Sequence, residues 1–186
     1  MALTQILTAF GLSASAGLNA YIPLLLIALL ARFTNWVTLS APFDLLTNEW
    51  VIGALVVLLA IETLADKVPG VDHVNDIIQT FIRPTAGAIL FAANANVLRD
   101  VNPVIPLVAG LLVAGSVHVT KAVARPVINV STLGVGAPFV SAAEDVAAFG
   151  TSLIAVFAPL VIIVVFVVFL FVLYKVLVLR SRASAR

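Results

Sequence analysis

The residues best suited to chemistry lie in one short stretch, between Ile61 and Pro84, which carries six charged side chains and a histidine. Glu62 and Asp66 are four residues apart, so on a continuous helix both carboxylates lie on one face. Carboxylates near a histidine, which titrates close to neutral pH, are groups that bind hard cations or relay protons. This stretch therefore predicts a polar site.

Asp72, His73 and Asp76 fall within five residues, directly after a Pro-Gly pair. One interpretation is ordinary capping, with Asp72 as the N-cap of an amphipathic helix over 73–82. Another is a weak metal site, because Asp72 and Asp76 lie one turn apart and their oxygens suit Mg²⁺ or Ca²⁺. A third is proton relay through the histidine.

Basic residues gather further along the chain, where His118, Lys121 and Arg125 share one face of an expected helix. An ionised group at the centre of a bilayer costs at least about 2.5–3.5 kcal/mol. We therefore expect some of these bases to meet acids across helices. Lys67 and Arg125 could instead reach the membrane surface by snorkelling.

Glu144 and Asp145 are adjacent acids in an otherwise apolar segment of small residues. Neighbouring side chains on a helix point about 100° apart, so the two cannot share one partner. We expect one of them to face a polar cavity, and either could complete a cation site with Asp72 and Asp76. The alternative is a surface loop that simply carries two acids.

The composition places these charges in an apolar chain. Of the residues, 62% are hydrophobic and 10% charged, and the mean hydropathy is +1.20. A soluble domain is about 45–50% apolar and about 25% charged. Because long Val, Leu and Phe runs lack the alternation of barrel strands, the spanning elements must be helices. The sequence predicts an all-α, polytopic transmembrane bundle.

The apolar segments give the expected organisation, a single membrane domain over 1–186. An interfacial loop with aromatic anchors is expected over 33–49. A weak segment, 138–149, decides between five spans and six. With six spans more of the Lys and Arg residues lie on the cytoplasmic side, and the charge rule therefore favours six. The strong segments lie at about 4–31, 50–66, 84–98, 104–124 and 150–178.

Glycine and proline predict where helices break. The small residues over 11–17 either let helices pack closely or interrupt the first helix. The stretch 121–138 should be irregular, and irregular backbone at membrane depth must line a cavity or be buried in protein. The helix-break candidates are Gly17, Pro69, Gly70, Pro84, Gly134, Gly136 and Pro138.

Several functional classes are excluded or disfavoured. Cysteine is absent, so thiolate metal sites and cysteine nucleophiles are ruled out. No basic run interleaved with aromatics points to nucleic acid. No motif of a hydrolase, nucleotide-binding protein or metalloprotease occurs. We expect neither an enzyme nor a cofactor, and the partners we expect are the lipid bilayer, a small ion or solute and, at most, further copies of the chain.

Three passages together resemble a family of small bacterial integral-membrane proteins known only as a domain of unknown function. The passages are GLNAYIPLLLIALLARF, ADKVPGVDHVND with RPTAGAI, and STLGVGAPFVSAAEDV. The resemblance covers most of the chain and implies a multi-pass protein of the bacterial inner membrane, without supplying an activity. The positions that it marks are Glu62, Asp66, Lys67, Pro69, Asp72, Asp76, Pro84 and Glu144.

These observations lead to one functional hypothesis and one alternative. The hypothesis is a small transporter or channel, in which Glu62 and Asp66 from the second span face the His118 and Lys121 helix and Glu144 across a polar cavity. The alternative is a non-transporting membrane component whose charges register helices or bind a partner or lipid. The basic tail, with Lys175 and Arg180, places the C-terminus in the cytoplasm.

Overall fold

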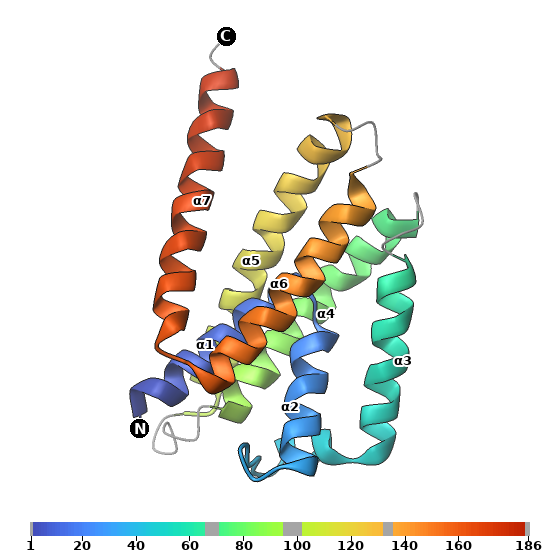
Figure 1. Cartoon of the computed structure of the whole chain (residues 1–186), viewed down its shortest axis with the longest axis vertical. Coiled ribbons are helices and arrows are strands. Elements are labelled where there is room, and N and C mark those ends of the chain that lie inside the picture. The colour runs from blue at the N-terminus through green and yellow to red at the C-terminus, as the bar shows by residue number, and fades with distance from the viewer. Residues whose placement is uncertain (1, 66–70, 95–101, 132–135, 185–186) are drawn as a thin grey trace.

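The structure is a computed structural model, and it describes residues 2–65, 71–94, 102–131 and 136–184. Within these ranges every regular element is helical (Figure 1), which confirms the all-α prediction. The elements are α1 (Ala2–Leu18), α2 (Tyr21–Phe33), the 3-10 helix η1 (Phe43–Thr47), α3 (Glu49–Ala65), α4 (Val71–Asn94), α5 (Val104–Ser131), α6 (Ala137–Phe157) and α7 (Val161–Ser184).

Helix α1 lies at the centre of the bundle and packs against α2, α4, α5, α6 and α7. In Figure 1, α7 stands at one side of the molecule and α3 at the other. The side of α1 that faces its neighbours carries small hydroxyls, and these bind backbone carbonyls of other helices. Ser13 donates to the Gly87 oxygen at 2.8 Å and Ser15 to the Ala148 oxygen at 2.7 Å. Short side chains thus let α1 approach two helices at once.

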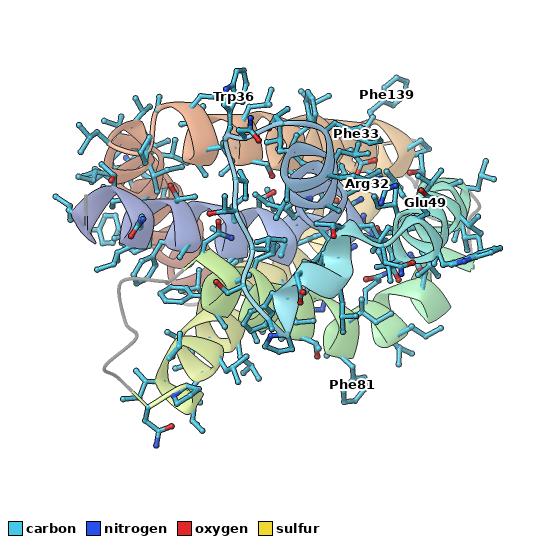
Figure 2. The ribbon with its side chains drawn as sticks, turned by 90° about the horizontal axis from the view of Figure 1, so that it is seen from below. Arg32, Phe33, Trp36, Glu49, Phe81 and Phe139 are labelled. Carbon is cyan, nitrogen blue, oxygen red and sulfur yellow. The ribbon has the colours of Figure 1, made fainter. Side chains whose placement is uncertain are left out.

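Several charged side chains lie inside the bundle beside its hydrophobic core, and many large hydrophobic side chains lie on its surface. Glu62, Arg83, His118 and Lys121 are all buried. Large hydrophobic side chains are exposed on α3, α5 and α7, and aromatic ones project from the surface at Phe33, Trp36, Phe81 and Phe139 (Figure 2). Exposing these hydrophobic side chains to water would be costly, whereas a lipid bilayer accommodates them.

Two of the described helices are long and apolar enough to cross a membrane. One lies in α5, over Val104–Arg125, and the other is α6, Ala137–Phe157. Shorter apolar helices occur at Leu3–Leu18 and Tyr21–Phe33. Because α6 is of spanning length, the weak segment 138–149 belongs to a full helix.

Gly87 and Gly110 mark the closest approach of α4 and α5. A Cβ added at Gly110 would overlap the carbonyl oxygen of Gly87 and lie 2.6 Å from the Cβ of Phe91. A Cβ added at Gly87 would lie 2.8 Å from the Gly110 oxygen. Glycine at both positions is therefore needed for the two backbones to touch.

Replacing Gly110 with alanine is expected to lower the free energy of unfolding by about 1–3 kcal/mol, because the new methyl group overpacks against backbone that cannot move aside. Denaturant titration of the purified protein in detergent measures the change. Gly53→Ala is the matched control, since nothing lies within 4 Å of a Cβ there. That control should gain about 0.5–1 kcal/mol from helix propensity. Equal effects at both positions would contradict the close approach.

The first helix break differs from the one predicted at Gly17. Helix α1 continues through Gly17, whose Cβ position lies 2.5 Å from the Ala114 oxygen, so this glycine serves close packing. The helix stops instead at Asn19 and Ala20, and α2 begins at Tyr21. The expected span 4–31 is therefore two helices.

Pro84 does not break its helix, contrary to the prediction. Helix α4 runs from Val71 to Asn94 with Pro84 inside it, so the expected short helix over 73–82 and span over 84–98 are one element. A proline removes one helical hydrogen bond, and the packing of α4 against α1 and α5 offsets that loss.

The other break predictions have mixed outcomes. Helix α5 extends to Ser131, so the expected irregular stretch 121–138 is helical over its first part. Gly136 and Pro138 stand at the start of α6, where proline is well tolerated. The expected segment 150–178 is divided, because α6 ends at Phe157. Pro69, Gly70 and Gly134 lie outside the described residues.

Candidate functional site

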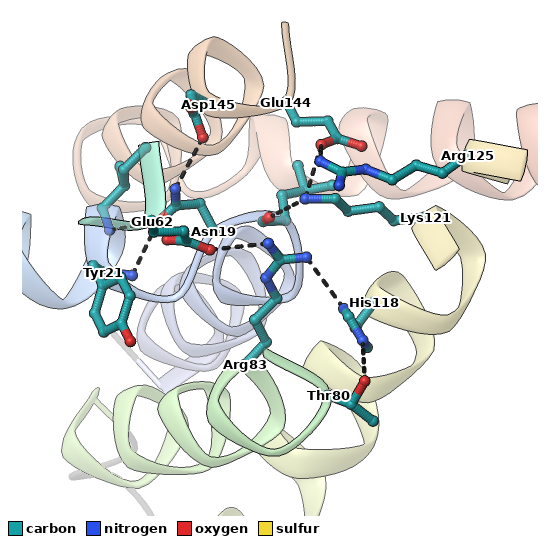
Figure 3. Close-up of polar contacts among 12 residues, drawn as sticks. Asn19, Tyr21, Glu62, Thr80, Arg83, His118, Lys121, Arg125, Glu144 and Asp145 are labelled. Carbon is teal, nitrogen blue, oxygen red and sulfur yellow. Dashed lines mark hydrogen bonds and ion pairs between the residues drawn. The ribbon is translucent and has the colours of Figure 1, made fainter. Parts of the chain in front are cut away.

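A chain of buried polar contacts links α3, α4 and α5 (Figure 3). Glu62 on α3 pairs with Arg83 on α4, with 2.9 Å between Oε1 and NH2. Their side chains are 2% and 0% exposed, respectively. The other terminal nitrogen of Arg83 lies 3.2 Å from Nδ1 of His118 on α5, and Nε2 of His118 lies 3.0 Å from the Thr80 hydroxyl. A guanidinium thus connects a carboxylate to an imidazole inside the bundle.

A second group of charges joins α5 to α6 (Figure 3). One carboxylate oxygen of Glu144 lies 2.8 Å from Nζ of Lys121 and 2.9 Å from NH2 of Arg125. Lys121 is 4% exposed, and the other two side chains are only partly exposed. Because two cations share one carboxylate oxygen, Glu144 holds together a pair of like charges that would otherwise repel each other.

The second group of charges, together with Asp145, meets the break between α1 and α2. Lys121 donates through Nζ to the Leu18 carbonyl at 3.1 Å, at the last residue of α1. The Asn19 side chain accepts from the backbone N–H groups that open α2 and donates to Oδ1 of Asp145 at 2.9 Å. Unwound backbone is costly in an apolar setting. Here Lys121 of α5 binds the freed Leu18 carbonyl, the Asn19 side chain binds the freed N–H groups, and Asp145 of α6 holds that side chain in place.

Two buried polar atoms beside this network have no hydrogen-bond partner within the described part of the chain. They are the side-chain oxygen of Gln79, an acceptor, and Nε of Arg83, a donor. The two residues lie one turn apart on α4, so they share a face. Gln79 also hydrogen-bonds the Tyr21 side chain. A buried donor and a buried acceptor without partners are costly, and a small polar molecule could satisfy both.

The structure brings together several of the residues singled out from the sequence. Glu62 reaches His118 through Arg83, and Lys121 and Arg125 meet Glu144 directly. Asp145 accepts a hydrogen bond from the Asn19 side chain. Asp66 and Lys67 lie outside the described residues, and the side chains of Asp72, His73 and Asp76, on the first turns of α4, are likewise not described.

Sequence analysis missed Arg83, which stands at the centre of the network. It also missed Asn19, Gln79 and Thr80. The signal for Arg83 was its charge, because a lone arginine on a helix with an apolar second half must find a partner. Asn19, at the end of a small-residue stretch, had the chemistry of a helix cap. No local signal marks Gln79 or Thr80 as part of a site.

The chain matches the family described as a domain of unknown function, DUF4126, over residues 6–179. It belongs to this family. The match includes both groups of charges and the break between α1 and α2, so the site described above lies within the family domain. No curated protein and no solved structure matches the chain.

A groove of about 510 Å³ lies between α1, α5 and α7 of this DUF4126 chain, and its walls are apolar. Phe10, Leu112, Ile162 and Phe166 are among the residues that line it. It is therefore not the polar cavity expected from the sequence. Among the described residues no group of three or more His, Asp and Glu side chains could hold a metal ion. The weak metal candidates Asp72 and Asp76 have side chains outside that description.

Proposed function

We propose that this protein is an integral membrane transporter or channel that moves a small ion or solute through the polar interior of its bundle. The observation that carries the proposal is the placement of ionised side chains. Glu62, Arg83 and Lys121 are almost fully buried, within a bundle whose exterior exposes large hydrophobic side chains. Buried charges of this kind in membrane proteins mark ion and solute pathways.

The break between α1 and α2 adds support. Transporter sites form where a spanning helix is interrupted and its backbone becomes available to polar groups. Here the Leu18 carbonyl is bound by Lys121, and Asn19 is bound by Asp145. The charges and the interrupted helix thus belong to one region of the molecule.

The unpartnered atoms of Gln79 and Arg83 suggest where cargo could bind. One is an acceptor and the other a donor, both on α4 beside Glu62. A small polar solute, or an ion with its water, has complementary groups. This proposal requires no enzymatic activity and no cofactor. We place the protein in the bacterial inner membrane with the basic C-terminal tail in the cytoplasm.

Reconstitution into liposomes tests the proposal. Purified protein is expected to dissipate an imposed gradient, followed with a trapped pH-sensitive dye for protons and with a voltage-sensitive dye for Na⁺, K⁺ and Cl⁻. Gln79→Leu is expected to bring flux down to the level of empty liposomes. The variant deletes a buried acceptor that has no partner in the described part of the chain, and it also removes the hydrogen bond of Gln79 to the Tyr21 side chain, so its folding is measured directly.

Glu49→Gln is the matched control, because Glu49 lies at the surface in an exposed pair with Arg32. This variant should transport like the unchanged protein. Circular dichroism and gel filtration establish that each variant is folded. Absence of flux under every gradient with the folded, unchanged protein would overturn the transport proposal.

One observation favours a different function. The ionised groups of the two clusters are paired with each other, and the groove between α1, α5 and α7 is apolar. Such pairs are able to fix the register of helices without conducting anything. A non-transporting membrane component that binds a partner or lipid is therefore the second candidate, and the liposome experiment separates the two.

A further inference from the structure

The contacts of His118 fix which of its nitrogens carries a proton. An arginine side chain donates hydrogen bonds and cannot accept them. Since NH1 of Arg83 lies 3.2 Å from Nδ1, that nitrogen must be the acceptor and carry no proton. The neutral imidazole then has its proton on Nε2, which donates to the Thr80 hydroxyl at 3.0 Å. The arrangement requires a neutral histidine in a single tautomer.

We infer that His118 is the proton-binding group of this site, and that proton uptake at Nδ1 breaks its contact with Arg83. The inference rests on the proposed transport function and names its coupling ion. The incoming proton comes from water and bonds to the Nδ1 lone pair, which until then accepts from Arg83. No other covalent bond changes, and the charge of the imidazole goes from zero to plus one. Release of the proton from Nδ1 to water reverses the step.

The surroundings of His118 link proton binding to the contact between two helices. Two partners of His118, Arg83 and Thr80, lie on α4, so these hydrogen bonds join α5 to α4. Protonation replaces the contact with Arg83 by repulsion between two cations. Arg83 retains its other partner, Glu62 on α3. Proton binding at one atom therefore weakens the α4–α5 contact and leaves the α3–α4 contact in place.

The described side chains near His118 carry a net positive charge. Lys121 and Arg125 follow it along one face of α5, and Glu144 from α6 neutralises only one charge of that pair. On α4, Arg83 is neutralised by Glu62, and the side chains of Asp72, His73 and Asp76 lie outside the description. Helix α1, which also packs on α5, has no ionisable side chain between Ala2 and Leu18. An imidazolium thus adds to this net positive charge, and movement of α5 relative to α4 would relieve the repulsion.

Nitrogen NMR of the imidazole tests the inference without depending on transport. The chain has two histidines, so His73→Gln leaves His118 as the only one. With ¹⁵N-histidine in lipid nanodiscs, the spectrum at the upper end of a titration between about pH 8 and 5 should show the Nε2–H tautomer alone. Acidification should convert it to imidazolium, and the ¹⁵N resonances of the Arg83 guanidinium should shift in the same step.

Two further variants keep the test decisive. Thr80→Val removes the acceptor of Nε2–H at an exposed position, so it should fold, and Arg83 should still keep Nδ1 free of a proton. Arg83→Lys keeps a donor and should preserve the Nε2–H tautomer. A spectrum of Nδ1–H or of imidazolium throughout the titration would overturn the inference, as would protonation without any shift at Arg83.

Flux measurements separate this inference from the proposed function. His118→Gln is expected to abolish uptake driven by a pH gradient. If the unchanged protein transports but His118→Gln responds to a pH gradient as before, the proton site is wrong and the transport function stands. If the NMR result holds but no gradient drives flux, the transport function is wrong and His118 is a proton-binding group without transport.

Discussion

Replacing Glu62 with glutamine is expected to lower the free energy of unfolding by about 3–5 kcal/mol. The substitution leaves the Arg83 guanidinium, which is 0% exposed, without its carboxylate. A buried charge that has lost its partner retains the full cost of dehydration, and this cost exceeds what the pair contributed. Denaturant titration in detergent measures the loss.

The control for Glu62 is the exposed pair formed by Arg32 and Glu49, in which the glutamate is 78% exposed. Glu49→Gln should cost no more than about 1 kcal/mol, because water screens the pair. The double variant Glu62→Leu, Arg83→Met should recover most of the stability, since it removes both charges. Similar losses for Glu62→Gln and Glu49→Gln would show that the Glu62 carboxylate is not buried against Arg83.

Replacing Glu144 with glutamine should have the second largest effect, about 3 kcal/mol. Its carboxylate oxygen is the shared partner of Lys121 and Arg125. Without that negative charge, two cations one turn apart on α5 face each other in a poorly hydrated place. Helix α5 is expected to lose its contact with α6, and the change is measured by the same titration.

A double-mutant cycle isolates the cause of the Glu144 effect. Lys121→Met alone should destabilise the protein, because it breaks a buried pair. In the Glu144→Gln background the same change should stabilise it, because it removes one of two uncompensated cations. Coupled residues of this kind show interaction energies of about 0.5–3 kcal/mol. Strictly additive effects would contradict the shared ion pair.

The sequence predicted the helical class and the position of α3 because both follow from local composition. The seventeen residues Glu49–Ala65 are mostly apolar, and an apolar segment of this length predicts a helix from local sequence alone. The same local rules failed at Pro84, where tertiary packing offsets a missing hydrogen bond. They failed again at Asn19, where Lys121 from another helix binds the freed Leu18 carbonyl and Asp145 binds the Asn19 side chain.

The identity of the charged residues was visible in the sequence, and so was the need for them to find partners in an apolar chain. The sequence did not show which of these residues pair with each other. Glu62 and Arg83 are on different helices, and so are Lys121 and Glu144, so no spacing along the chain relates them. The direct packing of α4 on α5 at Gly87 and Gly110, together with the packing of α1 against α4, α5 and α6, brings these helices close enough for the side chains to meet. The sequence by itself determined that charge must be compensated inside an apolar helical bundle, and the tertiary structure decided which groups compensate it.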